Sequence, residues 1–187
     1  MRASASTSVT NFTDEGSLAE RGGAWLFLRW LADQKGEDVL SRIVQSGDTG
    51  KTNVAHKAGE EFAQLFGDFS IALYTDSLPG VARTAVPRRY RFTSPNRNLR
   101  QIFARLYELG APDVTAPYPI VPLAVPLNGS VAGSIPGGTM DFYTLTTPAG
   151  SAGIALQFQR NPPGSFDPSL GAQLGVFRLP PPAAAGP

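Results

Sequence analysis

The sequence predicts an α+β protein in which a helical N-terminal subdomain is followed by a small antiparallel β-sandwich. All 17 prolines lie from Pro79 onward, and 14 of them lie from Pro112 onward. Because proline removes a backbone donor that a helix interior needs, the proline-free first part favours helices. Apolar residues recur with a helical period before Pro112 and alternate after it. We therefore expect a helical subdomain at residues 1–110, a linker at 111–117, the sandwich at 118–179 and a Pro/Ala-rich tail at 180–187.

Two helices are predicted near the N-terminus. Ser17 and Glu20 form a capping box, which predicts the start of the first helix. The residues that follow are apolar nearly all round, a pattern typical of a helix buried between other elements, and Gly36 is a plausible end. Residues 37–45 then predict a second, short helix with acidic groups in its first turn. A Gly- and Thr-rich loop is expected at residues 46–52.

Two further helices are predicted from apolar stripes. The first stripe recurs at i, i+3, i+4, i+7 and i+11, and it ends before a turn signal at residues 76–80. The next helix is expected from about Asn98 to Leu109, with Asn96 as its cap and Gly110 as its stop. The two stripes consist of Phe62, Leu65, Phe66, Phe69 and Leu73, and of Leu99, Ile102, Phe103 and Leu106.

After Pro112 the sequence predicts short strands. Residues 139–146 and 153–159 alternate between apolar and polar side chains, as half-buried strands do. Residues 123–127, 131–133 and 173–179 are weaker strand candidates. Gly- and Pro-rich turns separate these segments, and short strands with frequent turns predict an antiparallel sandwich.

Composition excludes several kinds of chemistry. The chain has no Cys and one His, so it lacks the residues for thiol catalysis, disulfides and almost every usual zinc site. Its most apolar stretch, residues 24–32, is interrupted by Arg29 and is too short to cross a membrane. The formal net charge of +1 gives no general attraction to nucleic acid. We expect no transmembrane segment in the chain and no nucleic-acid partner.

Weak motifs do not change this picture. Residues 46–52, SGDTGKT, end like a phosphate-binding loop, but Gln45 stands where that loop needs its first glycine. His56 is the only imidazole base available, and an exposed helical position is the simpler interpretation. The acidic residues show no calcium-loop spacing. We therefore predict that the chain is not an enzyme and has no catalytic residue, metal ligand or cofactor.

The strongest polar signal is a run of arginines. Residues 77–107 contain seven Arg and no acid, whereas residues 1–76 carry 7 basic and 11 acidic groups. Arg favours bidentate pairing with carboxylate or phosphate. Three interpretations stay open: pairing with the acidic helices, contact with a protein partner, and contact with anionic lipid headgroups. The predicted partner-binding residues are Arg83, Arg88, Arg89, Arg91, Arg97, Arg100, Pro180, Pro181 and Pro182.

A series of segments resembles one bacterial enzyme family. It comprises RGGAWLFLRWLAD at residues 21–33, Thr49-Gly50 with Asn53, and FAQLFGDFSIALY at 62–74 with Asp76. These segments resemble the helices downstream of the active site in secreted zinc metallopeptidases of the hyicolysin-like, gluzincin type. Likewise, GGTMDFY at 137–143, followed by Ala149-Gly150, resembles the small sandwich after such catalytic domains.

The zinc motif of that family is missing here. It requires two histidines, separated by Glu and two residues on one helix, and a downstream Glu ligand, whereas this chain has only His56. The resemblance thus implies a peptidase-like C-terminal region without its active site, from a lineage that works outside the cytoplasm. A cytoplasmic location stays open, because residues 1–16 lack the apolar run of a secretory signal.

Three functions follow as hypotheses. The first is a non-enzymatic, extracytoplasmic accessory or structural subunit that docks on a larger, membrane-associated complex, with a photosynthetic reaction-centre–antenna complex as one possible host. The second is the non-catalytic part of a metallopeptidase whose zinc domain lies on another chain. The third is a binding module for sugar or peptide on the sandwich face.

Overall fold

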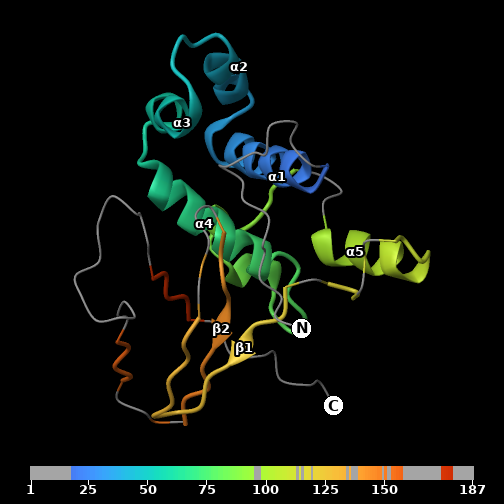
Figure 1. Ribbon diagram of the computed structural model, residues 1–187, viewed down its shortest axis with the longest axis vertical. Coiled ribbons are helices and arrows are strands. Elements are labelled where there is room, and N and C mark those ends of the chain that lie inside the picture. The colour runs from blue at the N-terminus through green and yellow to red at the C-terminus, as the bar shows by residue number, and fades with distance from the viewer. Residues whose placement is uncertain are drawn as a thin grey trace.

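The computed structural model describes residues 18–94, 98–112, 114, 116–118, 120–133, 135, 139–148, 150, 153–157 and 174–178. Figure 1 shows α2 and α3 at one end of the long axis and the strands β1 and β2 toward the other, with α5 projecting to one side. The α-helices are α1 (Leu18–Lys35), α2 (Asp38–Val44), α3 (Gly50–Ala58), α4 (Phe62–Thr75) and α5 (Leu99–Glu108). Two short 3₁₀ helices, η1 (Arg83–Ala85) and η2 (Arg88–Tyr90), lie between α4 and α5.

The first two predicted helices are confirmed as α1 and α2. The amide of Gly36 donates to the carbonyl of Ala32 at 2.8 Å, which closes the last turn of α1. Gly36 has a φ of +94°, a value that favours glycine, and it lets the chain turn directly into α2. No helix in the part of the chain that the structure describes is long and apolar enough to cross a membrane.

The loop predicted at residues 46–52 is wrong at its C-terminal end, because α3 begins at Gly50. Thr49 is extended, and its carbonyl accepts the amide of Asn53 at 3.3 Å in the first turn. Val54 and Ala58 pack against the apolar core, so tertiary burial stabilises a helix that the local sequence does not favour. Gly59, with a φ of +68°, ends α3 in the left-handed conformation common at helix ends.

The third predicted helix is confirmed as α4, and its stripe forms the centre of the core. Phe69 lies with its ring centroid 5.3 Å from that of Phe27 and 6.0 Å from that of Trp30. Phe69 and Trp30 are each 1% exposed. The apolar face of α1 therefore packs on the apolar face of α4, as the two sequence patterns require.

The fourth predicted helix is confirmed as α5, but its predicted cap is wrong. The cap is Asn98, whose side-chain oxygen accepts the amide of Gln101 at 2.9 Å, and not Asn96. Asn98 has the extended backbone of a cap, and a side chain at that position reaches the third amide of the helix. Leu99 is buried, whereas Ile102, Leu106 and Leu109 are exposed.

The predicted antiparallel β-sandwich is wrong. The only strands in the described part of the chain are β1 (Leu123–Ala124) and β2 (Tyr143–Thr144), and they pair in parallel. Residues 131–133, 153–157 and 174–178, which the sequence predicted as strand segments, are not strands. No second sheet covers β1 and β2 within the described residues. The alternation of apolar and polar side chains in these segments therefore indicates an extended backbone and not the strands of a sandwich.

Prolines explain why the sheet stops at β1. The amides of Leu123 and Val125 donate to the carbonyls of Phe142 and Thr144 at 2.9 and 2.8 Å. Successive residues of a strand point their backbone groups in opposite directions, so Pro122 and Pro126 occupy the other edge. Neither proline has an amide hydrogen, so a further strand could not form a regular ladder on that edge.

Aromatic contacts join the C-terminal segments to the helices. The hydroxyl of Tyr118 donates to the carbonyl of Leu73, and the Tyr118 ring lies 5.7 Å from that of Phe103. Tyr118 and Met140 belong to the same buried core as the helices. The predicted boundaries at 1–110, 111–117, 118–179 and 180–187 stay predictions.

Candidate functional site

The arginine-rich segment, by which we mean residues 77–107, contacts α1 and α4 at η2. Hydrogen bonds to its backbone hold it there. The indole nitrogen of Trp30 donates to the carbonyl of Arg89 at 3.2 Å, and the side-chain amide of Gln34 donates to the carbonyl of Arg91 at 3.1 Å. From α4, the hydroxyl of Thr75 donates to the carbonyl of Tyr90 at 2.6 Å. These bonds hold η2 against both core helices.

Asp33, in the last turn of α1, binds the arginine-rich segment just beyond η2. Its carboxylate accepts the amides of Thr93 and Ser94 at 2.9 and 3.0 Å, and also the hydroxyl of Ser94. Arg29 donates to the same carboxylate at 3.0 Å. Burial raises the pKa of Asp33, but the hydrogen bonds from Ser94, Thr93 and Arg29 outweigh it, so the pKa is lowered.

Asp68 of α4 binds the segment at its middle. The Nε of Arg89 donates to the Asp68 carboxylate at 2.9 Å, and Glu60 lies 3.4 Å from the same guanidinium. The hydrogen bond to Asp68 raises the pKa of Arg89, although burial opposes this. Arg89 therefore forms an ion pair within the chain.

Asp76 follows α4 and connects it to α5. Its carboxylate accepts the amide of Leu99 at 3.1 Å, and its carbonyl accepts Nε of Arg100 at 3.2 Å. The Arg100 guanidinium also donates to the carbonyl of Tyr74 at 2.7 Å and lies 4.2 Å from the centre of the Tyr118 ring. Burial raises the pKa of Asp76, partly offset by the Leu99 amide and the nearby positive charges.

Within the described residues, the remaining arginines of the predicted site bind main-chain oxygens and no carboxylate. Arg88 donates to the carbonyl of Asp33 at 3.2 Å, and Arg91 donates to that of Arg83 at 2.8 Å. Arg83 in turn donates to the carbonyl of Phe92. The other predicted residues, Arg97, Pro180, Pro181 and Pro182, lie outside the described residues.

Internal pairing therefore accounts for only part of the arginine run. The charge imbalance between residues 1–76 and 77–107 indicated such pairing, but it did not indicate which residues pair. Sequence reasoning missed the importance of Asp33, Asp68 and Asp76, which are 7%, 4% and 1% exposed. Asp33 and Asp68 interrupt otherwise apolar helix faces, which was the available signal for these two residues.

A second candidate surface is the C-terminal arm, by which we mean the described residues from 120 to 178. Among the residues that the structure describes, ten of the sixteen exposed large apolar side chains belong to it. Sequence reasoning missed this surface because it assigned alternating residues to a covered sheet. The ten residues are Val121, Leu123, Leu127, Val131, Ile135, Tyr143, Ile154, Leu156, Leu174 and Val176.

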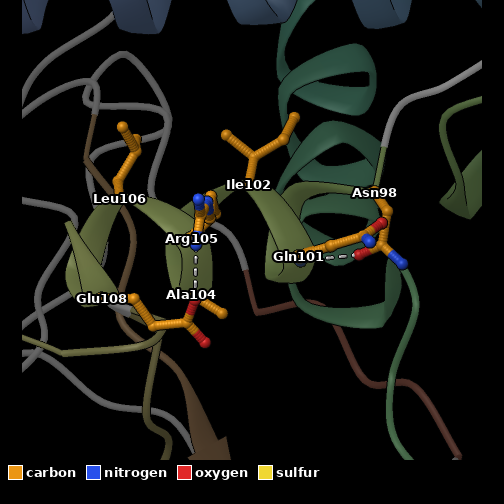
Figure 2. A pocket seen from close by; sticks show the side chains of 7 residues that line it. All are labelled: Asn98, Gln101, Ile102, Ala104, Arg105, Leu106 and Glu108. Atoms are coloured by element: carbon orange, nitrogen blue, oxygen red, sulfur yellow. Dashed lines mark hydrogen bonds and ion pairs between the residues drawn. The ribbon is translucent and has the colours of Figure 1, made fainter.

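One hollow of about 520 Å³ lies beside α5 (Figure 2). Its two charged side chains, Arg105 and Glu108, pair with each other at 3.3 Å. Ile102 and Leu106 supply its apolar part, and both are exposed. The hollow thus presents no free nucleophile or base. Its lining is Asn98, Gln101, Ile102, Ala104, Arg105, Leu106 and Glu108.

Residues considered for metal or nucleotide chemistry do not form a site in the described part. His56 lies on α3, where its Nδ1 is 3.1 Å from the carboxylate of Asp48. Gly50, Lys51 and Thr52 are in the first turn of α3 rather than in a loop. Among the described residues, no group of three His, Cys, Asp or Glu side chains could hold a metal ion.

Comparisons with protein families, curated proteins and solved structures found no match to this chain. The resemblance to the non-catalytic region of zinc metallopeptidases therefore stays a prediction.

The raised pKa of Asp76 predicts a specific pH dependence. Because the folded pKa lies above that of the unfolded chain, the contribution of Asp76 is complete below about pH 3.9 and is lost as the pH rises through the folded pKa. Asp76→Asn should remove this loss while keeping an oxygen that can accept the Leu99 amide. Urea unfolding of both proteins from about pH 4 to about pH 7 measures the difference. Parallel stability profiles would contradict the prediction.

Proposed function

We propose that this chain is a non-enzymatic accessory subunit that docks on a larger protein complex through its C-terminal arm. The exposed apolar side chains of that arm carry the proposal. Val121 and Val176 are each 65% exposed, and Ile154 and Leu156 are nearly half exposed. Exposed apolar side chains in such number on one arm favour a protein–protein contact, because apolar surface gains free energy when a partner covers it.

The backbone of the arm supports the same function. Its strands contain only two residues each, so it has little internal pairing in the described part. An extended segment with exposed apolar side chains can order fully on a partner and can wrap a large surface. The helices, by contrast, bury their apolar faces in a packed core, to which Met140 of the arm also contributes. The arm is therefore the part that we expect a partner to cover.

The proposed host is a membrane-associated complex, and the chain attaches to it from the extracytoplasmic side. The resemblance to secreted metallopeptidases supports the extracytoplasmic side. A chain that docks peripherally needs no membrane-crossing helix.

The native size of the protein in a gently solubilised extract of its own cells tests the proposal. We expect migration with a large complex, and we expect Val121→Asp and Val176→Asp to release the chain. Val44→Asp is the matched control, because Val44 is 83% exposed but lies on α2. Migration of the wild type at its own mass of 19.8 kDa would overturn the proposal.

The chains that migrate with the protein identify the class of its host. A zinc-bearing peptidase chain, together with hydrolysis that appears only in the mixture, would support the alternative function as part of a metallopeptidase. Structural or membrane-embedded chains would support the accessory subunit.

A further inference from the structure

The arginine-rich segment contains two kinds of arginine. Arg89 and Arg100 are used within the fold, the first by the Asp68 carboxylate and the second by two carbonyls and the Tyr118 ring. Arg88 and Arg91 make no bond to any carboxylate in the described part of the chain. A main-chain carbonyl is neutral overall, so these two guanidiniums keep their full positive charge.

We propose that Arg88 and Arg91 bind the carboxylates of an acidic segment of the partner protein. This inference rests on the proposed function, since it requires a docking partner, and it adds the chemistry of the contact. The two residues belong to one turn, in which the amide of Arg91 donates to the carbonyl of Arg88 at 3.2 Å. The partner's carboxylates would therefore meet two positive charges that are close together along the chain.

The geometry fixes both side chains before a partner arrives. Each guanidinium has five N–H donors, and its bond to a carbonyl uses one of the terminal nitrogens. Because these bonds already restrict the long side chains, a partner loses less side-chain entropy on binding them.

The surrounding charges favour a narrow acidic segment over an anionic membrane. Glu60 lies beside Arg89, the neighbour of Arg88 in the chain, and Glu37 pairs with Arg29 on α1. A flat anionic surface would face these acids together with the arginines, and the net charge of the whole chain is only +1. A peptide can place its carboxylates on the two arginines alone.

The experiment measures binding of a fluorescent hexaglutamate peptide to the full chain at low ionic strength, by anisotropy. We expect wild-type binding that weakens with added salt, and about fivefold weaker binding for Arg88→Gln and for Arg91→Gln. Arg42→Gln is the matched control, because Arg42 is a partly exposed arginine already paired with Asp38 on α2. Its affinity should equal that of the wild type.

A second measurement does not depend on the folding of variants. In the wild type, peptide addition should shift the side-chain NMR signals of Arg88 and Arg91 and leave that of Arg42 unchanged. No binding by the wild type, or equal binding by all variants, would overturn the proposal. Binding to phosphatidylglycerol vesicles but not to the peptide would also overturn it, and would assign the arginines to a membrane surface.

The two proposals can fail separately. Migration with a large complex, combined with no peptide binding, would refute only the carboxylate contact. Migration at the mass of the single chain would refute the accessory-subunit function, whatever the peptide does.

Discussion

Asp33→Ala is expected to lower the free energy of unfolding by about 3–5 kcal/mol, because it removes a buried carboxylate from its partners. The amides of Thr93 and Ser94 and the guanidinium of Arg29 would each lose an acceptor. The side chain of Asp33 is only 3% exposed, so water replaces these bonds poorly. Urea unfolding at neutral pH measures the change.

Asp38→Ala is the matched control for this substitution. The Asp38 carboxylate is 66% exposed and pairs with Arg42 one turn along the same helix. We expect a change within about 0.5 kcal/mol, as for other exposed ion pairs. If both variants lose equally little stability, Asp33 does not hold the arginine-rich segment in place.

Phe69→Ala is expected to cost about 3–5 kcal/mol, because it leaves a cavity at the centre of the core. The Phe69 ring contacts those of Phe27 and Trp30, and the Phe92 ring lies 6.4 Å away at a steep angle. Its removal therefore weakens the packing of α1, of α4 and of the segment that carries Phe92. The thermal midpoint and the urea midpoint should fall together.

Tyr107→Ala provides the aromatic control on α5. Tyr107 is 47% exposed, so its truncation leaves no buried cavity, and we expect a change within about 0.5 kcal/mol. Phe69→Leu, which keeps most of the apolar volume, should cost less than Phe69→Ala. A Phe69→Ala variant as stable as Tyr107→Ala would show that this cluster does not hold the helices together.

Most helices could be predicted because their signals are local. The stripe from Phe62 to Leu73 fixes both the helical period and the buried face of α4. Gly36 ends α1 because few other residues adopt its left-handed backbone. The start of α3 was missed because Gly50 and Thr52 are poor helix formers. The packing of Val54 and Ala58 against the core stabilises the helix in spite of them.

The strands could not be predicted in the same way. Alternation at residues 139–146 and 153–157 indicates an extended chain, but it does not say which segment pairs with which, or in which direction. The observed pair joins Leu123 to Tyr143 in parallel, across twenty positions of sequence. The prolines beside β1 were visible in the sequence, but their effect depends on which edge faces β2.

The same contrast between local signals and tertiary pairing applies to the candidate site. Four of the helices, the stripe that forms the core and the excess of arginine in residues 77–107 follow from the amino-acid sequence. Three features follow only from the packing of the chain: Asp68 pairs with Arg89, Asp33 binds the backbone beyond η2, and Arg88 and Arg91 meet no carboxylate in the described chain. Helix signals act over a few neighbouring residues, whereas strand partners and ion pairs join segments that the sequence separates by tens of residues. Which strands pair and which charged groups pair depends on the faces that the packed helices present, and no short stretch of sequence contains that information.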